Sequence, residues 1–207
     1  MSFKEEINEL ENLELTNDYK ISMGNIPILF TAPHTMEQIR TDGSIKKAEP
    51  YTKAIALYLN KHMNTYSMIK LLDTGLDSNR DNHDEFKNKL LDLVDEHNIK
   101  LVIDLHGASV NREFDVEFGT MNNLTADFST INELKEAFIE NGITKISFNN
   151  PFKGGAITQY LYNKKDIDVI QLEINYKYRD YSNLENLKLL IESLSNFIKQ
   201  YKEYRER

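Results

Sequence analysis

The chain has 207 residues, of which 40% are hydrophobic and 28% are charged, a balance typical of a folded domain rather than a disordered chain. Its formal net charge of -8 argues against a nucleic-acid-binding surface, because phosphate binding needs clustered lysine and arginine. The chain has no cysteine, which excludes disulfides, thiolate nucleophiles and cysteine-ligated zinc and leaves His, Asp and Glu as possible metal ligands.

The N-terminal segment and the apolar runs bear on where the protein acts. Residues 1–15 are too acidic for a signal peptide, and no apolar run approaches the ~20 residues that a membrane-spanning helix needs. We therefore expect a cytoplasmic protein without a membrane partner. The sequence does not indicate an oligomeric state.

Short apolar runs alternate with amphipathic segments along the chain. The runs are rich in Ile, Val and Leu and predict buried strands over residues 26–31, 67–72, 101–105, 145–148 and 169–174. Amphipathic spacing predicts helices over residues 50–63, 84–97 and 184–201, and His83 is expected to begin the second of these. This alternation predicts one α/β domain over residues 1–207, with a three-layer α/β/α fold and a mostly parallel or mixed sheet.

Two histidines and a glutamate fall at the ends of predicted strands, which is where the sites of α/β sheets lie. His34 follows the first strand, His106 follows the third, and Glu173 lies near the end of the fifth. Imidazole and carboxylate are ligands that zinc prefers, and a catalytic zinc site uses three of them with water in the open position. The sequence therefore predicts zinc at His34 and His106. For His34 alone, the alternative is a loop histidine bonded to the backbone.

An acidic residue is the expected third ligand, and there are two candidates. Glu37 forms a His-x-x-Glu pattern with His34, whereas Glu49 directly precedes the helix predicted from Pro50. We prefer Glu49, because a rigid element holds a ligand better than a loop does. The alternative for Glu49 is a favourable interaction with the helix dipole.

Two further carboxylates suggest catalytic or orienting roles. Glu173 lies in a run otherwise suited to a buried strand, where an ionised carboxylate is costly without partners. Beside a zinc-bound water it would be the general base and would pass the proton to the leaving nitrogen; the alternative is a structural pair with Arg179 or a lysine. Asp104 alternates to the same side as His106, so it either orients a ligand imidazole or caps the next turn.

Two arginines and a glycine pair follow the predicted site strands. The guanidinium groups of Arg80 and Arg179 suit bidentate recognition of a carboxylate and predict a small acidic substrate, although each is alternatively a solvated surface charge. Gly154 and Gly155 either allow close approach of a ligand at a helix start or form a tight turn.

Five short motifs occur in a characteristic order: Ala-Pro-His at 32–34, Asp-x-Asn-Arg at 77–80, Asp-Leu-His-Gly at 104–107, Gly-Gly-x-x-Thr at 154–158 and Gln-Leu-Glu-Ile at 171–174. In this order they resemble the N-formylglutamate amidohydrolase family. That family is similar to zinc carboxypeptidases, whose order of His, Glu, Asn-Arg, His and catalytic Glu would be reproduced by His34, Glu49, Asn79-Arg80, His106 and Glu173. The Glu-x-x-Thr of that wider group also matches residues 49–52.

The resemblance implies a phosphorylase/hydrolase-like fold and hydrolysis of the C–N bond of a linear amide such as N-formylglutamate. It also implies zinc as the cofactor, Glu173 as the base, and Asn79 and Arg80 at the substrate. The chain departs from the family at Gly107, where serine is more usual, and between His34 and Asn79, where the usual acidic pattern is missing. The alternatives are a carboxypeptidase-like enzyme acting on peptides or γ-glutamyl chains, and an inactive zinc-binding homologue.

Overall fold

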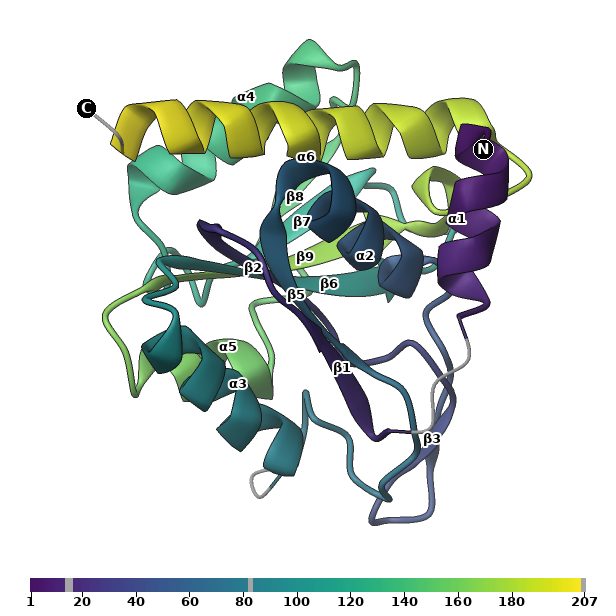
Figure 1. Ribbon diagram of the computed structural model, residues 1–207, viewed down its shortest axis with the longest axis vertical. Helices are drawn as coiled ribbons and strands as arrows, with labels where there is room; N and C mark the ends of the chain where they lie inside the picture. The colour runs from purple at the N-terminus through teal and green to yellow at the C-terminus, as the bar shows by residue number, and fades with distance from the viewer. Residues whose placement is uncertain (14–16, 82–83, 206–207) are drawn as a thin grey trace.

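A mixed β-sheet forms the centre of the molecule in the computed structural model, which describes residues 1–13, 17–81 and 84–205 (Figure 1). Its strand order is β1-β5-β2-β6-β9-β7-β8, in which β5, β2, β6 and β9 are mutually parallel, β1 and β7 run antiparallel to their neighbours β5 and β9, and β8 is parallel to β7. The strands are β1 (Tyr19–Ser22), β2 (Ile26–Ala32), β5 (Thr65–Lys70), β6 (Leu101–Ala108), β7 (Val116–Gly119), β8 (Ile146–Phe148) and β9 (Asp168–Asn175). A separate hairpin pairs β3 (Gln38–Ile39) with β4 (Ile45–Lys46).

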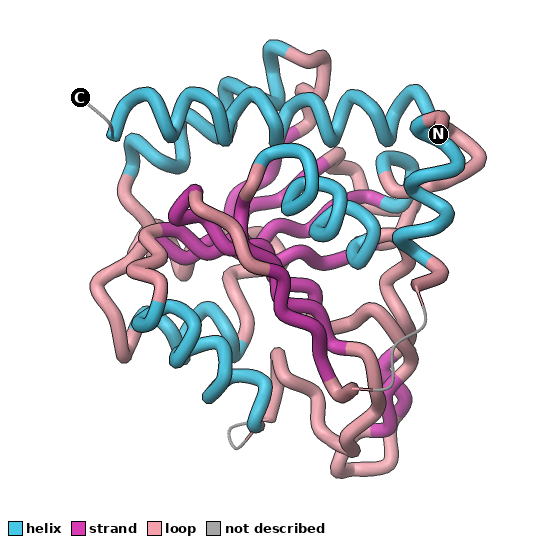
Figure 2. Tube along the Cα trace, in the orientation of Figure 1, coloured by secondary structure: helices cyan, strands magenta, loops and turns pink. Residues whose placement is uncertain are grey.

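Helices cover both faces of the sheet, which appears in Figure 2 as strands between two groups of helices. One layer contains α1 (Phe3–Glu11), α2 (Thr52–Met63), α4 (Phe128–Glu140) and α6 (Leu184–Arg205), and its apolar faces form the larger buried core. The other layer contains α3 (Glu85–Glu96) and α5 (Ala156–Tyr162) over a smaller core, and a 3₁₀ turn (Tyr176–Tyr178) follows β9. The predicted α/β class with a mixed, mostly parallel sheet is therefore confirmed.

The predicted strands and helices are all present, with shifts of a few residues at their ends. The elements without a predicted counterpart include α1, β1, β7, the β3–β4 hairpin and α4. His83 lies outside the described residues. Among the described helices, none is both long and apolar enough to cross a membrane.

Strand register determines which side chains reach the carboxyl edge together. On β6, Asp104 and His106 alternate onto the face that α3 and α5 cover, and on β9 Gln171 and Glu173 do the same. Asp104 lies opposite Gln171 and His106 lies opposite Glu173 in the parallel β6–β9 pair. The sheet thus presents two pairs of polar side chains side by side, beyond the apolar residues that pack under the two helices.

The first turn of α2 is capped by a side chain from another helix. Tyr51, at the N-cap position, provides no side-chain cap. Instead, Glu11 at the end of α1 accepts hydrogen bonds from Tyr51 N at 2.9 Å and Ala54 N at 3.2 Å. A carboxylate at this position satisfies donors that the helix leaves free and interacts favourably with the helix dipole. Helix α1 therefore fixes the start of the helix that follows Glu49.

Replacing Glu11 with alanine should lower the free energy of unfolding by about 0.5–2 kcal/mol, the usual cost of losing an N-cap. Urea unfolding of the two proteins would measure the difference. The matched control is Glu9→Ala on the same helix, whose exposed side chain makes no hydrogen bond to α2 in the described part of the chain, so its effect should stay within about 0.5 kcal/mol. Equal effects of the two substitutions would contradict the cap.

Candidate functional site

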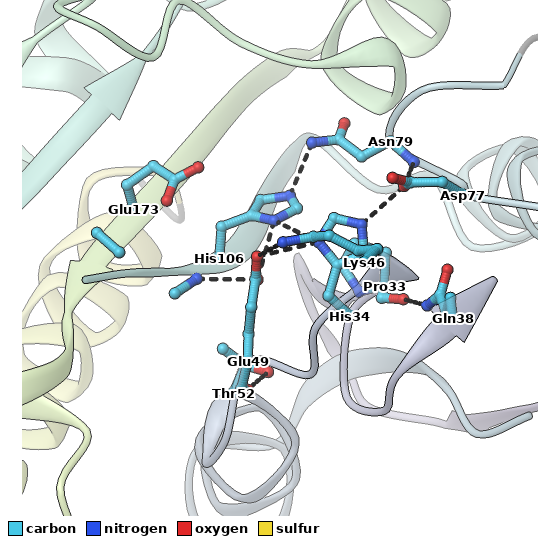
Figure 3. A network of polar contacts seen from close by, with 12 residues as sticks. Pro33, His34, Gln38, Lys46, Glu49, Thr52, Asp77, Asn79, His106 and Glu173 are labelled. Atoms are coloured by element: carbon cyan, nitrogen blue, oxygen red, sulfur yellow. Dashed lines mark hydrogen bonds and ion pairs between the residues drawn. The ribbon is translucent and has the colours of Figure 1, made fainter. Parts of the chain in front are cut away.

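Three buried side chains from separate segments meet at the carboxyl edge of the sheet (Figure 3). His34 follows β2, Glu49 precedes α2 and His106 lies on β6, with exposed fractions of 3%, 6% and 1%. The two Nδ1 atoms are 3.1 Å apart, and each lies 3.2 Å from a different oxygen of Glu49. The structure thus brings together the three residues that the sequence predicts as metal ligands. Glu37 is exposed and does not belong to this cluster.

The other nitrogen of each imidazole is held by a carboxylate. Nε2 of His34 is 2.8 Å from Asp77 Oδ1, and Nε2 of His106 is 2.9 Å from Asp104 Oδ2. Asp104 also accepts a hydrogen bond of 2.5 Å from Thr31 Oγ1. A carboxylate behind a ligand histidine fixes its ring and its tautomer, so Asp104 has the orienting geometry of the two alternatives considered for it. The same arrangement at Asp77 was not predicted from the sequence.

The electrostatics of the cluster favour a positive charge at its centre. Burial alone would lower the pKa of His106, but Asp104 and Glu49 raise this pKa well above its ordinary value. Burial alone would raise the pKa of Glu49, but the two imidazoles outweigh burial and hold that pKa well below its usual range.

A metal ion fits this donor set. When each ring donates from Nε2 to its carboxylate, both Nδ1 lone pairs and the Glu49 carboxylate face one point. The two lone pairs and the carboxylate repel one another unless a proton or a cation lies between them. Two imidazoles and a carboxylate match the preference of zinc, which binds neutral imidazoles and an ionised carboxylate.

The backbone around Glu49 is fixed at several points. Glu49 N donates to His34 O at 2.7 Å, and Thr52 Oγ1 donates to Glu49 O at 2.8 Å. Tyr51 adopts a left-handed conformation with φ of 68°, which is uncommon for a residue other than glycine, and its ring stacks on Tyr181. A strained turn of this kind persists only where its surroundings determine it, and such turns concentrate at functional sites.

Arg179 contributes to the same turn and is not among the described residues that line the pocket, so its predicted contact with substrate stays a prediction. Its buried guanidinium donates to three backbone carbonyls: Ile174 O at 3.1 Å, Pro50 O at 2.5 Å and Ala108 O at 3.2 Å. A Cβ atom at Gly107 would overlap this guanidinium, which accounts for the glycine at that position. Arg179 therefore ties together the segments that carry Glu49, His106 and Glu173.

Glu173 lies on β9 directly opposite His106 and is 6% exposed. Gln171 Nε2 donates to its Oε1 at 2.8 Å. Burial raises the pKa of Glu173, and this effect outweighs the attraction of His106. A buried carboxyl with a raised pKa beside a candidate metal centre is suited to proton transfer.

A second buried carboxylate, Glu117, lies across the antiparallel β7–β9 pair from Glu173. Its Oε1 accepts a hydrogen bond of 2.6 Å from Phe152 N, and burial raises its pKa. Glu117 thus anchors the segment after β8 against the site. Glu117 was not predicted from the sequence, because β7 is only four residues long.

Asn79 and Arg80 both reach the pocket, in different ways. Asn79 Nδ2 is 3.2 Å from His106 Nε2 and donates to Gln171 Oε1 at 3.3 Å. Its own oxygen accepts from Ile157 N in the first turn of α5. A Cβ atom at Gly155 would overlap the Asn79 carboxamide, so this glycine makes room for a protein side chain. Arg80 lines the pocket wall but forms an exposed ion pair of 2.8 Å with Asp42.

These residues line a pocket of about 700 Å³ that contains five basic side chains, namely Arg40, Lys46, Arg80, Arg112 and Lys153. Three of them form ion pairs with acidic residues of the site or its rim: Lys46 with Glu49, Arg40 with Asp77 and Arg80 with Asp42. Within the described residues, Arg112 and Lys153 form no ion pair, so they remain available to an anionic ligand. Sequence analysis missed Lys46, Arg112 and Lys153, which lie in loops or a two-residue strand without any motif.

Comparisons with known proteins agree with this geometry. A model of the N-formylglutamate amidohydrolase family matches residues 78–178, a span that includes Asn79, His106 and Glu173, and the family resemblance is thereby confirmed. No curated protein matches the chain significantly in sequence.

Several solved structures share the fold. An N-formylglutamate amidohydrolase from Ralstonia eutropha JMP134 has a TM-score of 0.68 at 13% identity, over 88% of this chain and 98% of that chain. A gene product from Agrobacterium tumefaciens has a TM-score of 0.63 at 13% identity, over 95% and 96% of the two chains. A bacteriophage poly-γ-glutamate hydrolase has a TM-score of 0.59 at 16% identity, over 97% of each chain.

Elemental analysis of protein purified without chelator should find about one zinc ion per chain, as expected for a site of this ligand set. Replacing His34, Glu49 or His106 with alanine should remove the metal, because each supplies one of three ligands. Glu37→Ala is the control and should retain it. Loss of metal in Glu37→Ala together with retention in Glu49→Ala would reverse the choice of third ligand.

Proposed function

Because residues 78–178 match the N-formylglutamate amidohydrolase family, we propose that this chain is a zinc-dependent amidohydrolase that cleaves the C–N bond of a linear amide in an acidic substrate. One observation carries the proposal: the cluster of His34, Glu49 and His106 shares a pocket with the buried carboxyl group of Glu173. A metal centre beside a proton-transfer group is the arrangement that metal-assisted hydrolysis requires.

The metal would be held by His34, Glu49 and His106. When bound, a zinc ion supplies Lewis-acid chemistry, since it polarises a carbonyl group and lowers the pKa of water. Asp77 and Asp104 hold the two imidazoles with Nδ1 toward the centre. Arg179 and the strained turn at Tyr51 keep Glu49 in reach of both rings.

Glu173 is the proposed proton carrier. Gln171 donates a hydrogen bond to Oε1 of Glu173, so Oε2 is the oxygen that would take a proton from the attacking water. Glu173 then returns that proton to the leaving nitrogen as the C–N bond breaks, so the amine departs neutral and the other product is a carboxylic acid, which loses its remaining proton to solvent. Burial supports both halves of this cycle, because it brings the pKa of the carboxyl group closer to neutral pH.

Basic side chains support the choice of an acidic substrate. Arg112 and Lys153 form no ion pair in the described part of the chain and lie on the pocket wall. A small N-acyl amino acid of the N-formylglutamate kind fits this chemistry through its carboxylates. The second candidate is a peptide or γ-glutamyl chain, which the 700 Å³ volume of the pocket also favours.

Replacing Glu173 with glutamine should lower kcat on a cleaved amide by about 10²–10⁴-fold, the usual contribution of a general acid–base. Metal content and the midpoint of thermal unfolding should stay close to wild type, since the substitution preserves shape and does not touch the ligands. Glu113→Gln, on an exposed glutamate, is the matched control and should keep wild-type kcat. Undiminished activity in Glu173→Gln would remove Glu173 from the mechanism.

Activity should fall on acidification through the raised pKa of Glu173, because only the ionised carboxylate accepts a proton from water. The acid limb of kcat/KM should therefore lie above the ~4.3 of an ordinary glutamate. The measurement is a pH–rate profile on enzyme whose metal content is checked at each pH. A profile that stays flat below the ordinary glutamate pKa, with metal retained, would contradict this assignment.

A further inference from the structure

A second depression lies beside the catalytic pocket and has a similar size. Its volume is about 730 Å³, against about 700 Å³ for the catalytic pocket. The residues that line it come from α4 and from the segments that follow β7 and β8, and we call it the distal pocket. Lys153 lines both cavities, so the two lie next to each other at this residue.

The backbone of Lys153 is fixed between the two cavities. Its carbonyl accepts a hydrogen bond of 2.5 Å from Met121 N, and the neighbouring Phe152 N is bonded to the buried Glu117. The position of the lysine backbone is therefore part of the fold. Its exposed side chain forms no ion pair within the described residues, which leaves the ammonium group available to a ligand in either cavity.

The charge of the distal pocket is opposite to that of the whole molecule. The chain has a formal net charge of -8, yet the described residues that line this pocket include Lys135 and Lys153 and no aspartate or glutamate. Within the described part of the chain, Lys135 forms one ion pair, a part-buried contact of 2.8 Å with the neighbouring Glu136 on the same helix. An anionic ligand is therefore attracted into this region of an otherwise acidic protein.

The uncharged groups of the distal pocket suit a chain of amides. The side chains of Asn122, Asn132 and Asn150 line it and form no hydrogen bond within the described residues. A carboxamide both donates and accepts, so it can bond the N–H and C=O groups of an amide-linked chain. The exposed rings of Phe128 and Phe148, which are 77% and 38% exposed, offer apolar contacts to methylene groups.

We propose that the distal pocket binds the remote part of an extended, polyanionic amide chain whose scissile bond lies at the His34, Glu49 and His106 cluster. The ligand class is an oligomer of acidic residues joined by amide bonds, such as γ-linked glutamate. Lys153 and Lys135 pair with successive carboxylates of that chain, and the asparagine side chains bond its amides. This inference rests on the proposed amidohydrolase function and selects the longer of its two substrate classes.

The kinetic test compares N-formylglutamate, a γ-glutamyl dipeptide and longer γ-glutamyl oligomers as substrates of the zinc-loaded enzyme. Wild-type kcat/KM should rise with chain length until the oligomer spans both cavities. In the double variant Lys135→Gln, Asn132→Ala, the ratio of kcat/KM on long substrates to kcat/KM on short ones should be about three- to tenfold lower than in wild type. This is the scale of one ion pair near the surface and one hydrogen bond. The control Lys199→Gln removes an exposed charge from α6 and should keep the full advantage.

A binding measurement separates this inference from the catalytic proposal. Fluorescence anisotropy with a labelled γ-glutamyl oligomer and Glu173→Gln enzyme should give a weaker affinity in the double variant than in the Lys199→Gln background. This result would support the distal pocket even if no amide were hydrolysed. Equal use of short and long substrates by an active wild-type enzyme would overturn the inference and leave the hydrolase proposal standing. Stronger competition by inorganic polyphosphate than by unlabelled γ-glutamyl oligomer would also overturn it.

Discussion

The burial of three carboxylates against two imidazoles is the constraint on which this edge of the molecule depends. Glu49, Asp77 and Asp104 are 6%, 1% and 0% exposed, and buried carboxylates are costly unless their oxygens are bonded. Each of their oxygens has a partner, either a ring of His34 or His106, a backbone amide, a hydroxyl or a basic side chain. Removing His106 would leave Asp104 Oδ2 buried without a hydrogen-bond partner among the described residues. The cluster therefore fixes two strand ends, the start of α2 and the loop at Asp77 relative to one another.

Arg179 complements that cluster from the opposite side of the ligand-bearing segments. It satisfies the carbonyls of Ile174, Ala108 and Pro50, which belong to two strands and the turn before α2. A guanidinium is suited to this role because its five donors spread over a planar fork. The planar fork that suits arginine to a substrate carboxylate here donates to backbone carbonyl groups. On the other side of the turn, Glu11 accepts a hydrogen bond from Tyr51 N.

The sequence predicts the central strands because they are continuous apolar runs, and it predicts His34 and His106 because strand ends converge in an α/β sheet. It predicts Glu49 because this residue directly precedes a helix. It does not predict β7, a four-residue strand that contains the buried Glu117. The role of Arg179 also lies beyond sequence reasoning, because only the tertiary arrangement determines whether an arginine faces carbonyl groups or solvent. Arg112 and Lys153 were not predicted for a similar reason. They stand out because they line the pocket and form no ion pair within the described residues, and only the tertiary structure shows this.

The register of β6 and β9 places His106 directly across from Glu173, and two neighbouring strands lie ~4.8 Å apart in any sheet. The separation of His106 and Glu173 is consequently a property of backbone hydrogen bonding rather than of loop conformation. The basic residues at the pocket wall lie instead in surface segments, which tolerate insertions and deletions. A change in loop length at this edge would therefore alter the charges on the pocket wall and leave the spacing of His106 and Glu173 as it is.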